Sequence, residues 1–143
     1  MNNKELWIKW GLSPWIKERK NYLIRSFVNN SSGLMLCITH YFRDDDNPGE
    51  LLLSFKEPVI FYQRTRVEFC EKLKNDAYVA YPDACAQLTF FKVINSRLVA
   101  HVQNNSQRAN PNVALIHFAI TEADSIVHIV VTHEPAIEWV SCE

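Results

Sequence analysis

Hydrophobic and polar residues alternate along most of this chain, and the strongest β-type pattern lies near its C-terminal end. Residues 113–120 and 126–131 are rich in Ile, Val and Phe, and a short polar segment at 121–125 joins them. β-branched and aromatic residues favour strands, and two such runs joined by four or five polar or small residues are typical of an antiparallel hairpin. We therefore predict a pair of strands here.

The same alternation predicts strands over most of the remaining chain. Composition marks residues 29–33 and 43–49 as turns. Residues 1–16 mix tryptophan with lysine and proline without a clear period, so we expect an irregular lead-in, or a short edge strand, that packs its tryptophans on the core. The predicted strands outside the hairpin are residues 22–28, 34–42, 51–55, 59–62 and 88–94, with a last edge strand at 137–140.

Two segments change to a helical period. Thr65 and Glu68 have the spacing of a capping box, in which the Thr hydroxyl accepts a backbone N–H and the Glu side chain reaches back, and this predicts a helix at 66–76. Ser96 is placed as the N-cap of a second short helix at 97–104. A strand continuing through 97–102 is the alternative.

Strands therefore outnumber helices and are mostly sequential neighbours. The predicted fold class is α+β, with a mainly antiparallel, strongly curved sheet of about six to eight strands and one or two short helices covering one face or end. A length of 143 residues suits a single domain.

Charge narrows the choice of partners. The net charge is −1, which argues against a general nucleic-acid binder. After Arg108 there is no Lys or Arg, whereas acidic residues recur up to the C-terminus. The two ends of the chain could neutralise each other, which we favour, or the acidic end could form a face for a basic partner.

Several classes of site are disfavoured. Three glycines cannot build a phosphate-cradling loop, so no nucleotide cofactor is expected. The four cysteines form no C-x-x-C pair and fit thiols in a reducing cytosol. The N-terminus lacks the pattern of a secretory signal, and no run approaches the ~20 apolar residues of a membrane helix. We expect a cytoplasmic protein that does not bind membranes.

The predicted hairpin carries one histidine on each arm, His117 and His128. With a four-residue turn Thr121 pairs with Ile126, and both histidines share one face of the sheet. With a three-residue turn they fall on opposite faces. A metal site needs three or more converging ligands, and no spacing brings a third residue to this pair, so we expect no metal.

The chain also shows a resemblance to a known class of proteins. The segments that carry this resemblance are 90–98 (FFKVINSRL), His117-Phe118-Ala119-Ile120-Thr121, Ile129-Val130 and Glu134-Pro135. Together they loosely resemble small single-domain bacterial proteins of uncharacterised function, some of them similar to immunity proteins that neutralise a toxin by binding it. The resemblance covers roughly the last 55 residues and implies a binding role with no catalytic residue.

These observations favour a non-catalytic, cytosolic protein-binding domain, such as an immunity or inhibitor protein that neutralises a basic partner by occlusion. Loop tips carry the carboxylates expected to bind: Asp44, Asp45, Asp46, Glu122 and Asp124. The alternative is a small-molecule-binding or hydrolytic domain whose cavity is lined by His117, His128 and Tyr62. An exposed apolar edge strand would also permit a homo-oligomer.

Overall fold

The structure, a computed structural model, describes residues 4–10, 22–40, 49–56, 59–66, 89–105, 114–121 and 125–141. Within these ranges it contains nine strands and one helix, α2 (Arg97–Asn105). The strands are β1 (Leu6–Lys9), β2 (Tyr22–Asn30), β3 (Gly33–His40), β4 (Gly49–Lys56), β5 (Val59–Arg66), β6 (Thr89–Ile94), β7 (Ile116–Thr121), β8 (Ser125–Val131) and β9 (Ala136–Ser141).

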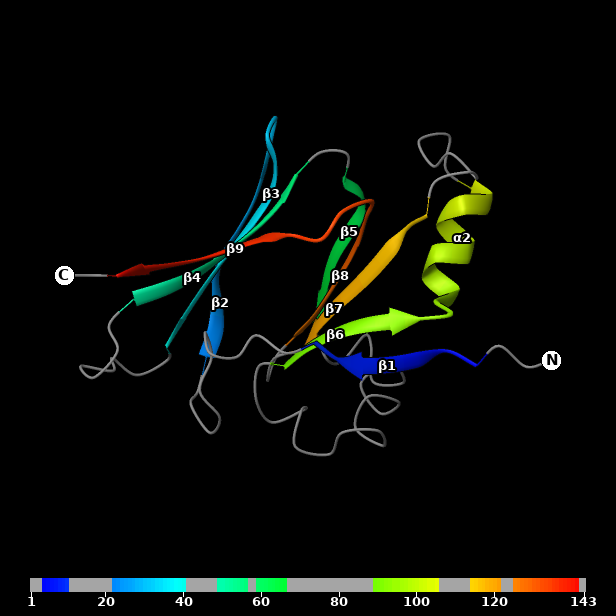
Figure 1. Cartoon of the computed structure of the whole chain (residues 1–143), viewed down its shortest axis with the longest axis horizontal. Helices are drawn as coiled ribbons and strands as arrows, with labels where there is room; N and C mark the ends of the chain where they lie inside the picture. The colour runs from blue at the N-terminus through cyan, green and yellow to red at the C-terminus, as the bar shows by residue number, and fades with distance from the viewer. Residues whose placement is uncertain are drawn as a thin grey trace.

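The strands form two antiparallel sheets (Figure 1). The five-stranded sheet has the order β1-β6-β7-β8-β5, and the four-stranded sheet has the order β2-β3-β4-β9. In Figure 1 the four-stranded sheet lies on the left, the five-stranded sheet lies to its right, and α2 lies beyond that. The described part of the molecule is therefore layered as sheet, sheet and helix.

The two sheets share one hydrophobic core, because side chains alternate between the faces of each strand. Every second residue of β3 and β4 points to the five-stranded sheet, and the register matches Leu36 with Leu53 and Ile38 with Leu51. The five-stranded sheet contributes apolar residues from β6, β7 and β8 to the same cluster, namely Phe90, Phe118, Ile120, Val127, Ile129 and Val131.

The five-stranded sheet is also buried on its other face. All seven residues of β8 are buried, whichever way their side chains point. A second apolar cluster occupies the face toward α2, consisting of Trp7, Phe91, Val93, Ala119 and Ile126. This sheet is therefore the middle layer, and the polar side chains that β7 and β8 place on its α2 face are held away from water.

The expectation of one strongly curved sheet is only partly confirmed. The strands are mainly antiparallel as predicted, but they divide into two sheets and neither is strongly curled. Long-range pairs cause the division: β1 pairs with β6, β5 with β8, and β4 with β9, and none of these joins neighbours in the chain. Part of the predicted lead-in forms β1, which packs Trp7 on the core as expected.

The helix predictions have different outcomes. The helix capped by Ser96 is confirmed as α2, and the alternative strand at 97–102 does not form. The proposed helix start at residue 66 is wrong, because Thr65 and Arg66 continue β5 and pair with Ile126 and Ser125. The remainder of 66–76 lies outside the described residues. No helix in the described ranges is long and apolar enough to cross a membrane.

Gly33 provides a test of the β2–β3 turn. Its φ of 130° is a conformation that side-chain-bearing residues rarely adopt, and an added Cβ would lie 2.1 Å from the backbone oxygen of Phe55. Gly33→Ala should therefore lower the free energy of unfolding by at least about 2 kcal/mol. Urea denaturation would measure it, with Ser32→Ala in the same turn as the control. Equal stability of both variants would contradict the strain at Gly33.

Candidate functional site

The β7–β8 hairpin brings the two histidines together. Thr121 pairs with Ile126, so the structure adopts the four-residue turn of the two alternatives. Ala119 lies opposite His128, and His117 is two residues from Ala119 on the same strand. Both rings consequently lie on the α2 face of the five-stranded sheet, with centroids 5.0 Å apart.

A chain of hydrogen bonds links the histidines to the start of α2. The Ser96 hydroxyl is 2.7 Å from His117 Nδ1, and His117 Nε2 is 2.8 Å from His128 Nδ1. Ser96 also caps the helix, because its Oγ accepts the backbone N–H of Val99 at 3.0 Å. We call Ser96, His117 and His128 the Ser-His-His chain.

The local sequence explains how Ser96 reaches this position. Asn95 directly follows β6 and has a φ of 55°, a left-handed conformation that asparagine tolerates better than most residues. This turn leads directly from the sheet into α2. The Asn95 side-chain amide donates to the backbone oxygen of Lys4 at 3.2 Å, which fixes the turn against the segment before β1.

The protons of the Ser-His-His chain can run in either of two directions, because each ring nitrogen donates or accepts according to the tautomer. If the Ser96 hydroxyl donates to Nδ1, His117 donates from Nε2 to His128 Nδ1, and His128 carries its own proton on Nε2. If His117 Nδ1–H donates to the Ser96 oxygen, His128 donates from Nδ1 to His117 Nε2, and His128 Nε2 is an unprotonated acceptor.

In either direction His128 Nε2 is a buried polar atom without a hydrogen-bond partner among the described residues. His128 as a whole is 6% exposed, and the Trp7 ring packs against it at a right angle with centroids 6.0 Å apart. A buried, unsatisfied polar group costs roughly 1–3 kcal/mol. The fold carries this cost at a position that is dry and enclosed by aromatic side chains.

Burial keeps the histidine pair neutral. Desolvation, reinforced by repulsion from a charged His128, lowers the pKa of His117 to about 3, although the Glu5 carboxylate acts in the opposite direction. Desolvation likewise lowers the pKa of His128, again against the attraction of Glu5. Neither ring is expected to carry charge at neutral pH.

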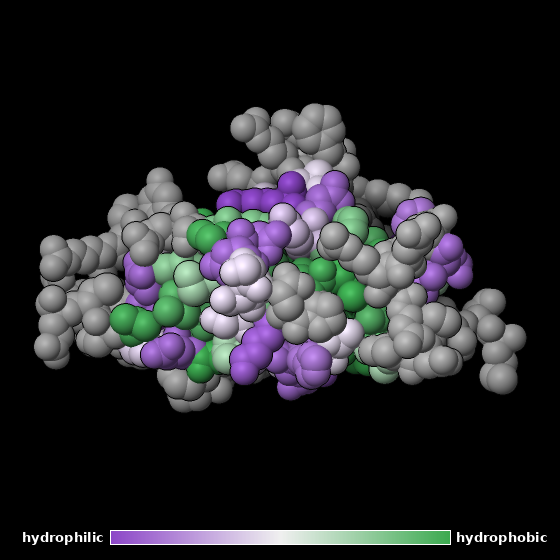
Figure 2. Space-filling model, turned by 90° about the horizontal axis from the view of Figure 1, so that it is seen from above, coloured by the Kyte–Doolittle hydropathy of each residue, from purple (hydrophilic) through white to green (hydrophobic). Residues whose placement is uncertain are grey.

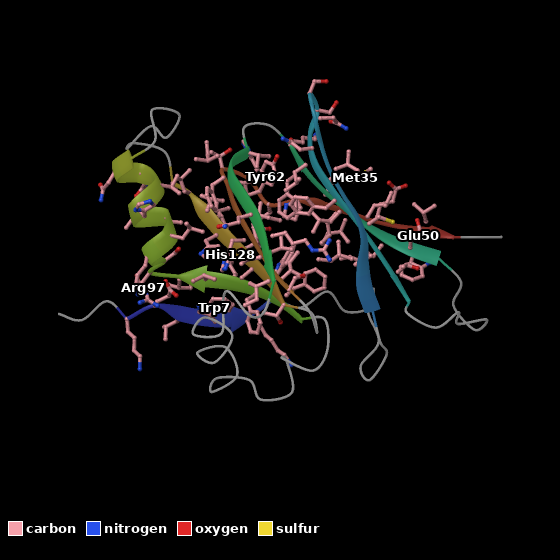
Figure 3. The ribbon with its side chains drawn as sticks, turned by 180° about the vertical axis from the view of Figure 1, so that it is seen from behind. Trp7, Met35, Glu50, Tyr62, Arg97 and His128 are labelled. Atoms are coloured by element: carbon pink, nitrogen blue, oxygen red, sulfur yellow. The ribbon has the colours of Figure 1, made fainter. Side chains whose placement is uncertain are left out.

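The Glu5 carboxylate connects Trp7 of β1 to the first residue of α2. It accepts the Trp7 indole N–H at 3.0 Å and the Arg97 backbone N–H at 2.8 Å, with the Arg97 Nε at 3.5 Å. Burial raises the pKa of Glu5, but these hydrogen bonds and the guanidinium charge outweigh it, and the pKa is lowered overall. A carboxylate at the first turn of α2 also suits the helix dipole. In Figure 3, Trp7, Arg97 and His128 lie near one another.

An open pocket of about 340 Å³ begins at Ser96. Among the described residues, no charged side chain lines it. Its walls are aliphatic, with one hydroxyl and two amide side chains: Val93, Asn95, Ser96, Val99, Ala100, Gln103 and Leu115. Ser96 is therefore the only member of the Ser-His-His chain that lines this pocket.

The other residues proposed from the sequence do not join this site. Tyr62 pairs with Ile129, which faces the core, so Tyr62 lies on the opposite face of the sheet from the histidines. Its ring is 41% exposed and its hydroxyl accepts a hydrogen bond from the Asn29 amide at 3.1 Å. The described residues contain no group of three metal-ligating side chains. The predicted binding carboxylates Asp44, Asp45, Asp46, Glu122 and Asp124 lie outside the described residues.

Ser96 and Trp7 are site residues that sequence reasoning did not assign to the histidines. Ser96 was expected only as a helix cap. Its contact with His117 spans 21 positions and depends on β6 and β7 being neighbours in the sheet. Trp7 reaches the histidines because β1 pairs with β6. Comparison with protein-family models, curated proteins and solved structures finds no match.

The neutral histidines predict a pH-dependent stability. A histidine whose pKa is lowered by folding stabilises the protein above its unfolded pKa, near 6.5, and this stability is lost as the pH falls toward the folded value. Each such histidine should contribute a slope of up to about 1.4 kcal/mol per pH unit below 6. Urea denaturation between pH 7 and 5 would measure the slope.

The matched variants for this experiment are His117→Gln/His128→Gln and His101→Gln, since His101 is exposed on α2. The double variant should flatten the slope, and His101→Gln should retain it. A slope that is unchanged in the double variant would contradict the assignment of the acid sensitivity to this pair.

Proposed function

We propose that this chain is a non-catalytic, cytosolic protein-binding domain that neutralises a basic partner by covering its surface, in the manner of an immunity or inhibitor protein. The observation that carries the proposal is the composition of one sheet face. This outer face is the side of the four-stranded sheet turned away from the core, with Val28, Met35, Glu50, Leu52, Glu138 and Val140 as its main residues.

A solvated sheet face normally carries polar side chains, whereas this one mixes aliphatic residues with polar ones such as Ser54 and Lys56. Val28 and Val140 are 41% and 37% exposed, and Met35 and Leu52 are half-buried. Figure 2 shows hydrophobic and hydrophilic side chains side by side at the end formed by the four-stranded sheet, on the left. Aliphatic groups gathered on an exposed face favour a protein-docking surface.

Two carboxylates, against the single cation Lys56 at the end of β4, make this face negative among the described residues. Glu138 pairs with Leu52, and Glu50 pairs with Val140, so each acid lies beside an aliphatic side chain. The Cys37 thiol donates to Glu50 Oε2 at 3.0 Å and orients that carboxylate. Met35 and Glu50 are marked in Figure 3. An apolar surface bearing fixed negative charge suits a partner with complementary Lys or Arg, and attraction of this kind mainly raises the association rate.

The test begins with affinity capture of binding proteins, followed by purification of the captured partner. The captured partner should be basic. Its activity should fall to zero when an equimolar amount of this domain is added, and the rate at which the two proteins associate should decrease with added salt. Glu138→Lys should weaken binding at least about tenfold, because the partner's cation would meet a like charge in a desolvated contact. The affinity is measured by biolayer interferometry.

The matched control is Glu134→Lys, which makes the same charge change off this face, where Glu134 is exposed and paired with Lys92 at 2.6 Å. It should leave the affinity within about twofold. An association rate independent of ionic strength, or equal binding by both variants, would contradict the proposed docking surface.

Hydrolysis is a second candidate, favoured by the contact of Ser96 Oγ with His117 Nδ1 at the edge of the pocket. Ser96 Oγ would attack an ester carbonyl while His117 takes its proton, passes it to the departing alcohol and later deprotonates the water that releases the acid. The pKa of His117, lowered to about 3 by burial, makes its imidazole a weak base, so this candidate ranks below binding.

A fluorophosphonate probe would decide this candidate. Hydrolytic competence predicts covalent labelling of Ser96 that persists at pH 5, where His117 is still neutral, and that is absent in Ser96→Ala but retained in Ser54→Ala. No labelling of the wild-type chain would remove hydrolysis and leave the binding proposal intact.

A further inference from the structure

β1 forms one edge of the five-stranded sheet and carries exposed aliphatic side chains. It pairs with β6, and no second neighbour is present among the described strands. Leu6 and Ile8 are 48% and 44% exposed, and Ile94, directly opposite Leu6, is 41% exposed. Leu6 and Ile8 are two residues apart, so all three project from the same face and form a contiguous aliphatic edge.

Such an edge can pair with another strand. The sequence of β1 makes it complementary to itself. If two copies align antiparallel with Trp7 opposite Trp7, Leu6 lies opposite Ile8 of the second copy, and Ile8 lies opposite its Leu6. Directly paired residues share a face, so the register places four exposed aliphatic side chains together, with Ile94 of each copy alongside.

Charges support the same register. Glu5 precedes Leu6 in the chain, and Lys9 follows Ile8. In the alignment centred on Trp7, Glu5 lies opposite Lys9 of the second copy at both ends of the strand pair, so the Lys9 ammonium joins Trp7 and Arg97 around the Glu5 carboxylate. A shift by one residue turns the aliphatic side chains of the two copies to opposite faces. A shift by two residues removes both Glu–Lys pairs.

We propose that this chain forms a homodimer in which the β1 edges of two copies pair antiparallel about a two-fold axis at Trp7, joining their five-stranded sheets. The contact is isologous, so it closes on itself and does not propagate into a fibre. The Lys92–Glu134 ion pair lies beside the aliphatic edge, since Lys92 is opposite Ile8, and it forms a polar rim. This surface lies on the other sheet from the docking face proposed above, so the two proposals stand independently.

The first experiment measures oligomeric state by size-exclusion chromatography with light scattering over a range of concentrations. The wild-type chain should elute at twice the monomer mass. Ile8→Lys should raise the dissociation constant by about thirtyfold or more, because it places a cation within the aliphatic contact. The control is Val28→Lys, which alters an equally exposed aliphatic residue on the four-stranded sheet and should remain dimeric.

The second experiment tests the register by oxidative cross-linking. The Leu6→Cys/Ile8→Cys chain should form a covalent dimer, because residues 6 and 8 of different copies face each other. The wild-type chain, with its four native cysteines, sets the background. A wild-type protein that stays monomeric would overturn the proposal. So would a dimer that survives Ile8→Lys, or one whose paired cysteines cross-link no more than the background.

Discussion

The burial of the five-stranded sheet on both faces is the constraint on which the rest of this structure depends. β8 has no solvated side, so each of its residues, including His128, must enter a dry layer. The face toward the four-stranded sheet is filled with aliphatic and phenylalanine side chains. The face toward α2 receives Trp7, His117 and His128, and burial there holds both histidines neutral.

This middle layer also determines where contacts with other molecules can form. Neutral histidines in a dry layer can exchange hydrogen bonds with Ser96 but make weak bases, and they position α2 more readily than they drive catalysis. The four-stranded sheet has only one face on the shared core, and its outer face, with aliphatic and acidic side chains, is the surface that we propose for a partner. The edge of the middle layer at β1 is likewise left with aliphatic groups at the surface.

The sequence predicted the local elements well because they depend on neighbouring residues. Ser96 followed by an apolar period of three to four residues identified α2, and alternation identified the strands. The sequence could not choose between turns of three and four residues in the β7–β8 hairpin, and that choice decides whether His117 and His128 meet. It also gave no basis for pairing β4 with β9, or for placing Tyr62 on the opposite face from the histidines, since both depend on long-range register.

The central claim is that the middle layer holds an uncharged histidine pair. The most direct measurement is the ¹⁵N NMR spectrum of the imidazole rings between pH 8 and pH 4.5. The account predicts that His117 and His128 are both neutral at pH 6 and that each ring carries a single proton. A protonated ring for either buried histidine near pH 6 would contradict it.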